Sequence, residues 1–255
     1  MIKETFVPLI MVTNDDGILS HGIQQLAAAL MSLGDVVVVA PDRERSAVGH
    51  AMTLNHPVRA DQISAGRFAV DGTPTDCVNL GIHGLLSRKP DLVVSGINRG
   101  SNLADDITYS GTVAAAMEAM LMQVPAVAVS LDVSHLCVDV DYSHACSYAQ
   151  RVSRQILLHG LPADTFLNLN IPVGIPRGLK ITRQGKRIYD NKIELKQDPR
   201  GRDYYWLGGN QLGFNRQQDC DCGAIADGFA SLTPLHLDLT NYHSMKQLSS
   251  WECDV

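Results

Sequence analysis

Short apolar runs recur along the chain, and between them the apolar residues follow a helical period. A continuous apolar run is typical of a strand that is buried on both faces of a sheet, as at residues 7–12 and 36–40. The predicted strands cover residues 7–12, 36–40, 68–70, 92–95, 125–131, 165–171, 179–182 and 230–235.

The stretches between the runs predict helices. Ile23, Leu26 and Leu30 share one helix face, and we expect that helix to end at Gly34. Thr73-Pro74 is the pattern of an N-cap followed by proline in the first turn, which predicts a helix to about residue 86. Further helices are predicted at residues 113–122, 142–158 and 242–251.

Strands that alternate with helices predict an α/β fold with three α/β/α layers, a Rossmann-like and largely parallel sheet with helices on both faces. We assign residues 1–255 to one domain of this kind. Ligands of such sheets bind beyond the carboxyl ends of the strands. The loops that follow residues 12, 40 and 95 are therefore the first places to look for chemistry.

The last third of the chain changes character. Residues 183–216 carry eight basic and four acidic side chains, and we call this segment the arm. Its centre, Asp198-Pro199-Arg200-Gly201, has the residues of a type I turn and predicts a protruding β-hairpin. Aromatic residues at 204–206 would be hard to accommodate on the surface of a monomer, so we expect the arm to contact another subunit. Residues 236–255 form a tail after the last predicted strand.

Composition narrows the class of protein. The 255 residues are 45% hydrophobic, which favours a globular chain with a sizeable core, and the formal net charge is −6. That acidity is unusual for a protein that binds DNA. Neither a secretory signal nor an apolar stretch long enough to span a membrane is seen, and the six cysteines are scattered rather than arranged as a disulfide framework. We expect a cytoplasmic protein with free thiols.

Two adjacent carboxylates follow the first predicted strand, in Thr13-Asn14-Asp15-Asp16-Gly17. If both turn toward one point they repel each other unless a cation or a proton lies between them. A hard divalent ion with oxygen ligands, Mg²⁺ or Mn²⁺, would meet that need. An Asx turn that caps the next helix explains the same residues equally well, so both interpretations stay open here.

A second group of residues offers donors for a phosphate. Ser110, Gly111 and Thr112 lead directly into an alanine-rich helix, whose free N–H groups and positive end suit an anion. Plain N-capping explains Ser110 alone. The motifs of dinucleotide-binding folds, P-loops and α/β-hydrolase nucleophile elbows are absent from the sequence.

Five motifs in order make the pattern specific. TNDDGI, APDRERSAVGH, DGTPTDCV, DLVVSGINRGSN and YSGTVAAAMEAM together resemble the SurE (survival protein E) family of metal-dependent nucleotidases, and NLNIP and GFASLTPL extend the resemblance to the end of the chain.

The resemblance implies one divalent ion per subunit, Mg²⁺ or Mn²⁺, bound by Asp15, Asp16, Ser46 and Asn98. It also implies hydrolysis of nucleoside 5′- and 3′-monophosphates, some activity on short polyphosphate, and a homo-oligomer, dimer or tetramer, formed through the arm and the tail.

Two positions depart from the family pattern. Ala47 stands where many members have glycine, which would stiffen the loop beside the metal. The sequence DCDCGAIADGF replaces a common Thr-Asp dipeptide, which leaves the roles of Asp219 and Asp221 open.

Our hypothesis is metal-assisted hydrolysis of a phosphomonoester in which Asp15 and Asp16 are the catalytic residues. Ser110, Gly111 and Thr112 would hold the phosphate, and Asn14 and Asn102, placed with them in the substrate-binding set, would orient this group rather than react. The general acid is left unassigned. Two rival interpretations are a haloacid-dehalogenase-like phosphatase with an aspartyl nucleophile and a non-catalytic nucleotide-sensing module whose basic arm contacts RNA or polyphosphate.

Overall fold

The computed structural model describes residues 6–133, 139–188, 193–207, 213–215, 217 and 219–251. Nine strands form one sheet in the order β3-β4-β2-β1-β5-β6-β7-β13-β8, and the arm carries two further pairs, β10-β11 and β12-β9. The strands are β1 (Leu9–Thr13), β2 (Asp35–Pro41), β3 (Ala60–Ser64), β4 (Arg67–Val70), β5 (Leu92–Arg99), β6 (Ala126–Asp132), β7 (Phe166–Pro172), β8 (Leu179–Ile181), β9 (Arg187–Ile188), β10 (Ile193–Gln197), β11 (Asp203–Leu207), β12 (Gly213–Phe214) and β13 (Ala230–Leu235).

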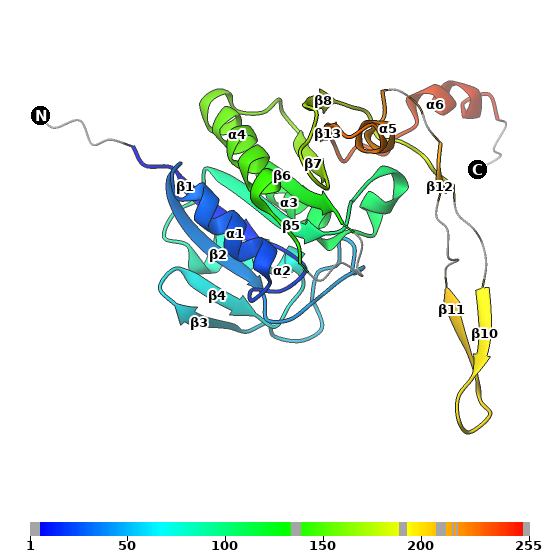
Figure 1. The fold of residues 1–255 in the computed structure, drawn as a ribbon, viewed down its shortest axis with the longest axis horizontal. Coiled ribbons are helices and arrows are strands. Elements are labelled where there is room, and N and C mark those ends of the chain that lie inside the picture. Colours follow the sequence, from blue (N-terminus) through cyan, green and yellow to red (C-terminus); the bar gives the residue numbers. More distant parts are fainter. Residues whose placement is uncertain are drawn as a thin grey trace, which may run out of the picture.

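The helices cover both faces of the sheet, as Figure 1 shows. They are α1 (His21–Leu30), α2 (Pro74–Leu80) with the π-helical turn η1 (Gly81–Leu85), the 3₁₀ helix η2 (Ala104–Thr108), α3 (Gly111–Leu121), α4 (Ser143–His159), α5 (Asp221–Ala226) and α6 (Tyr242–Leu248). One core cluster joins α1 and α4 to the sheet and a second joins α2 and α3 to its other face. The predicted three-layer α/β/α architecture is confirmed.

The sheet is largely parallel because its central strands are joined by helical crossovers. Val12 of β1 lies between Val38 of β2 and Val94 of β5 in parallel register. The exceptions are the edge strand β3, antiparallel to β4, and β13, antiparallel to β7. All five residues of β1 are buried, as expected for a strand covered on both faces. The carboxyl ends of β1, β2 and β5 therefore meet at one edge of the sheet.

Three of the differences from the sequence prediction have a clear physical reason. The strand expected to end at Ser95 continues to Arg99, because the chain resumes pairing with β6 at Asn98 after an irregularity. Helix α5 was not predicted, since six residues rich in cysteine, glycine and alanine show no clear period. The edge strand β3 was missed for a related reason: four of its five residues are exposed, so it has no apolar run.

The predicted start of α2 is confirmed in detail. The Thr73 hydroxyl accepts a hydrogen bond from the Asp76 backbone N–H at 3.1 Å, and the Asp76 carboxylate accepts the Thr73 N–H at 2.8 Å. These reciprocal bonds form a capping box.

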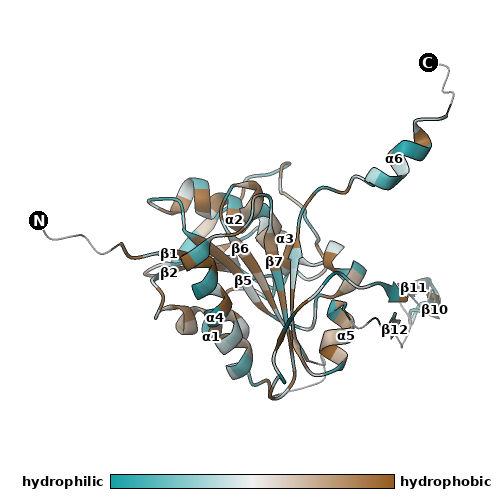
Figure 2. Ribbon diagram, turned by 90° about the horizontal axis from the view of Figure 1, so that it is seen from above, coloured by the Kyte–Doolittle hydropathy of each residue, from teal (hydrophilic) through white to brown (hydrophobic). Residues whose placement is uncertain are grey.

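The arm hairpin stands away from the body of the protein, as does α6 (Figures 1 and 2). The turn of the hairpin closes through a hydrogen bond from the Gly201 N–H to the Asp198 carbonyl at 2.9 Å, with Gly201 at φ 78°. None of the residues of α6 is buried. No helix in the described ranges combines the length and apolar character needed to cross a membrane.

Candidate metal and phosphate site

A cavity of about 730 Å³ opens at the sheet edge where β1, β2 and β5 end. Six of the nine predicted site residues line it, namely Asp15, Asp16, Ser46, Asn98, Asn102 and Ser110. The other three, Asn14, Gly111 and Thr112, are buried residues outside the cavity lining. Sequence segments that are far apart along the chain are thus brought to one place by the topology of the sheet.

Asp15 is held deep in the wall, with 4% of its surface exposed. Its Oδ1 accepts a hydrogen bond from the Thr112 hydroxyl, and its backbone carbonyl accepts the Arg45 N–H at 2.7 Å. Burial raises the pKa of the Asp15 carboxyl to about 6, the bond from Thr112 opposes that rise, and the Asp16 charge adds to it. A carboxylate in this setting is stabilised by a bound cation.

Asp16 and Asn98 supply the next oxygen atoms. The Arg99 N–H donates to Oδ2 of Asp16 at 3.2 Å, which ties the carboxylate to the end of β5. The Asn98 amide donates its own N–H to the Gly100 carbonyl at 2.7 Å. Because that bond uses the nitrogen, the side-chain oxygen of Asn98 remains available as a ligand.

Ser46 lies on the loop after β2. Its hydroxyl donates to Oε1 of Glu44 at 2.8 Å, so the serine oxygen keeps lone pairs that can face a cation. Ala47 has φ 56°, in the left-handed region where glycine carries no steric penalty. Glycine would adopt this conformation freely, whereas alanine adopts it at a steric cost.

These donors fit a hard divalent ion. In the described part of the chain, no three histidine, cysteine, aspartate or glutamate side chains gather as a metal cluster. Two carboxylates with neutral amide and hydroxyl oxygens are the sparse set typical of Mg²⁺, which keeps several waters and takes further oxygens from a phosphate. Oδ1 of Asn14 is also buried without a hydrogen-bond partner, so the vicinity of the carboxylates holds an unused acceptor.

The remaining predicted residues shape the wall. The Asn14 amide donates to the Gly17 carbonyl at 3.0 Å and to the Ser20 hydroxyl at 2.8 Å, which fixes the turn that carries the two aspartates. The Asn102 amide donates to the Ser130 hydroxyl at 2.8 Å. The side chains of both asparagines are thus held by hydrogen bonds to neighbouring residues.

The first turn of α3 packs closely against Asp15. Ser110 caps the helix by accepting the Val113 N–H at 3.1 Å, and it also faces the cavity. A Cβ on Gly111 would lie 2.9 Å from Cβ of Asp15, so the helix approaches the carboxylate more closely than any larger residue allows. The Thr112 side chain, expected on the phosphate, is instead bonded to Asp15.

Sequence reasoning missed several cavity residues. Arg99, Asp106, Tyr109, Tyr142 and His21 line the cavity. Asp106 and Tyr109 stand four residues and one residue before Ser110, and that proximity was the available signal. Tyr142 follows a segment without a motif, and only the fold brings it to the site.

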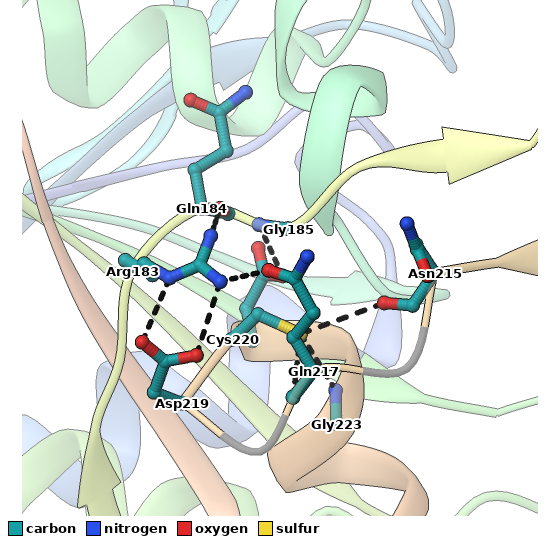
Figure 3. Close-up of polar contacts among 9 residues, drawn as sticks. Arg183, Gln184, Gly185, Asn215, Gln217, Asp219, Cys220 and Gly223 are labelled. Atoms are coloured by element: carbon teal, nitrogen blue, oxygen red, sulfur yellow. Dashed lines mark hydrogen bonds and ion pairs between the residues drawn. The ribbon is translucent and has the colours of Figure 1, made fainter.

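Asp221, whose role was open, is a structural anchor. It is 1% exposed and accepts backbone N–H groups from Ala104, Gly185 and Cys222 at 2.9, 2.9 and 2.7 Å. Asp219 lies at the surface in an ion pair with Arg183, drawn in Figure 3. Neither residue lines the cavity.

The cysteines of the described segments are free, as expected, and they are also buried. Cys220 caps α5 by accepting the Gly223 N–H at 3.3 Å and donates to the Gln217 carbonyl at 3.0 Å (Figure 3). Burial and the neighbouring Asp221 charge raise the pKa of Cys222 well above its usual range. Cys220 and Cys222 thus have packing and capping roles, while Cys137 and Cys253 lie outside the described residues.

Known proteins match the chain over most of its length. The family model described as Survival protein SurE matches residues 10–191. A protein of Syntrophotalea carbinolica named 5′-nucleotidase SurE is 59% identical over 243 residues, which are 95% of this chain and 97% of the relative. Another of that name, from Geobacter sulfurreducens, is 58% identical over 247 residues, covering 95% of this chain and 93% of the relative.

A solved structure agrees with these sequences. The crystal structure of the SurE protein from Aquifex aeolicus superposes with a TM-score of 0.83 at 42% identity, over 95% of this chain and 98% of that one. The family model, the curated relatives and the shared fold lead to one conclusion: the chain belongs to the SurE family.

Proposed function

We propose that this protein is a divalent-metal-dependent phosphomonoesterase that hydrolyses nucleoside 5′-monophosphates to nucleoside and phosphate. The observation that carries the proposal is the buried Asp15 carboxylate beside Asp16, at a cavity whose other oxygen donors are Ser46 and Asn98. The names of the curated relatives support the 5′-nucleotidase assignment. Family membership does not favour a haloacid-dehalogenase-like phosphatase or a non-catalytic sensor.

The finer assignments belong to the same proposal. They are 3′-nucleotidase activity, activity on short polyphosphate, one Mg²⁺ or Mn²⁺ per subunit, a cytoplasmic location, and a dimer or tetramer formed through the arm and tail, with neither DNA nor a membrane as a partner.

Different residues of the chain have different roles in the proposed hydrolysis. Asp15, Asp16, Ser46 and Asn98 hold the ion, which when bound supplies Lewis acidity to the phosphate and to water. Thr112 and Arg45 fix Asp15, so the carboxylate does not have to reorganise as charge shifts. Ser110, at the start of α3, binds a phosphate oxygen, and the positive end of the helix favours the anion.

Phosphate release from AMP or GMP, with and without a chelator, tests the proposal. We expect Asp15→Asn and Asp16→Asn to abolish release while the unfolding transition stays cooperative. Asp61→Asn, an exposed aspartate on β3, is the matched control and should keep full activity. Turnover that survives chelation would contradict the metal requirement, and a trapped phospho-enzyme would favour an aspartyl nucleophile instead.

A further inference from the structure

Helix η2 connects the active-site cavity to the base of the arm. Asp106, on η2, and Tyr109, just after it, line the cavity. On its other side the same segment packs its apolar residues Leu103 and Ala104 in a cluster with Cys220, Cys222 and Ile225. One wall of the site is therefore supported by a part of the chain that comes long after it in sequence.

Polar contacts hold this junction together. The backbone N–H of Arg187 donates to Oδ2 of Asp105 at 2.9 Å, and the side-chain amide of Gln184 donates to the Ala104 carbonyl at 3.1 Å. Asp221 accepts the Ala104 N–H from the side of α5. These bonds attach η2 to the start of the arm and to α5.

The ion pair of this junction involves a cavity residue. Nη1 of Arg187 lies 2.7 Å from Oδ2 of Asp106, and the two side chains are only 12% and 27% exposed. The centroid of the Phe214 ring lies 5.8 Å from the guanidinium carbon. A half-buried pair of this kind is screened much less by salt than a surface pair.

The Arg187–Asp106 pair affects the balance of charges in the cavity. The described residues of the cavity lining include four carboxylates and one guanidinium, those of Asp15, Asp16, Glu44, Asp106 and Arg99. A divalent ion offsets two of the carboxylates, and a phosphomonoester then brings up to two more negative charges. Any further negative charge on the wall opposes substrate binding.

We propose that Arg187 is a positioning residue of the nucleotidase site, which neutralises Asp106 and so lets the wall of the cavity accept a phosphate dianion. The proposal rests on the proposed function, because only an anionic substrate gives this neutralisation a catalytic consequence. Since Arg187 belongs to the base of the arm, it also makes the affinity for phosphate depend on the attachment of the arm.

Steady-state kinetics on AMP test the proposal. Arg187→Met makes the wall one unit more negative, so we expect KM to rise about tenfold while kcat changes less than twofold. Adding Asp106→Asn removes the carboxylate charge that Arg187 no longer neutralises and that opposes phosphate binding. The double variant should therefore return KM to within about threefold of the wild type. A purely structural role predicts that the double variant is no better than Arg187→Met, and that result would overturn the proposal.

Two controls separate charge from packing. Arg187→Lys keeps the charge and should keep KM near the wild-type value. Arg183→Met removes a guanidinium from the same segment and should leave KM unchanged, because Arg183 pairs with Asp219 at the surface (Figure 3) and neither residue lines the cavity. An equal rise of KM in Arg183→Met would contradict the proposal.

Product inhibition gives a second readout. In Arg187→Met, the inhibition constant of inorganic phosphate should rise with KM, while that of uncharged adenosine should not. If Arg187→Met does not fold, the single variant Asp106→Asn tests the proposal. A KM equal to or below that of the wild type supports the proposal, and a tenfold higher KM refutes it. A wild type that releases no phosphate from AMP would instead refute the proposed function.

Discussion

The hydroxyl of Thr112, on the first turn of α3, donates a hydrogen bond to Oδ1 of Asp15, at the end of β1. Both residues are buried, Thr112 completely, so water does not compete for this bond. The bond orients the carboxylate, whose pKa burial raises to about 6. We therefore expect Thr112 to act through Asp15.

Thr112→Val should weaken catalysis without removing any proposed ligand. Loss of the hydroxyl frees the carboxylate to rotate, and loss of such supporting bonds typically costs 10–100-fold in metal affinity or activity. We expect kcat/KM to fall by about that factor and the metal concentration for half-maximal activity to rise. Thr112→Ser keeps the hydroxyl and is the matched control. Equal activity of the valine and serine variants would contradict the role given to this bond.

Gly111→Ala tests the close approach of α3 to the site. The added Cβ would lie 2.9 Å from Cβ of Asp15, 3.0 Å from its Oδ2 and 3.1 Å from Cγ of Pro74. Because Asp15 is locked by its bonds, we expect the carboxylate to move and activity to fall at least tenfold, at a stability cost of about 1–3 kcal/mol. Phosphate release and thermal unfolding measure the two effects.

The control for this variant is another glycine. Gly84→Ala meets only the Leu80 side chain, at 3.1 Å from its Cδ1, and that flexible group can move. We expect activity to stay within twofold of the wild type. If Gly111→Ala were as active as Gly84→Ala, the approach of α3 to Asp15 would have no catalytic importance.

Local pattern was enough to predict most of the fold and much of the site. The apolar run before Asp15 and the Thr73-Pro74 cap are local signals, and both elements formed where expected. Asp15, Asp16, Ser46 and Asn98 could be brought together from sequence because parallel strands end at one edge of the sheet, and the family resemblance selected them.

The features of the site that could not be predicted from the sequence depend on long-range contacts. Nothing near Arg187 indicates that its guanidinium meets Asp106, because that contact depends on how the arm is attached to η2. The same holds for Thr112, whose place in a phosphate-binding pattern hid its bond to Asp15. Asp221 is similar, since its three backbone partners come from separate segments as well as its own helix.

Asp76 gives a prediction about stability and pH. Burial raises the pKa of this carboxyl, but bonds from Thr53 and Thr73 outweigh burial, and the net effect holds the pKa below its ordinary value. The folded state therefore gains stability from the ionised carboxylate above about pH 4, and this gain is lost as the pH falls through the lowered pKa.

Asp76→Asn should remove that contribution. The amide cannot accept all of the bonds from the Thr53 N–H, the Thr53 hydroxyl and the Thr73 N–H, at 2.8, 2.6 and 2.8 Å. We expect a loss of about 1–3 kcal/mol in the free energy of unfolding at pH 7. The difference from the wild type should shrink below pH 4 in urea titrations. A difference that stays constant down to pH 3 would show that the carboxylate charge is not the cause.

The arm offers a prediction about assembly. In the hairpin, Leu195 pairs with Tyr205, and Ile193 lies on the same face because side chains alternate along a strand. These three side chains are 56%, 61% and 63% exposed, in that order, and together they give the hairpin an apolar face in water. The opposite face pairs Glu194 with Trp206, so it is more polar.

An apolar face of this kind is stabilised by contact with another subunit. We expect deletion of residues 192–207 to lower the subunit count measured by light scattering, and Leu195→Lys with Tyr205→Lys to do the same while keeping the hairpin. Lys196→Gln changes the opposite face and is the control, with an unchanged count. Phosphate release per subunit reports whether the site survives. If both the deletion and the double lysine variant kept the wild-type count, the arm would not be an oligomer contact.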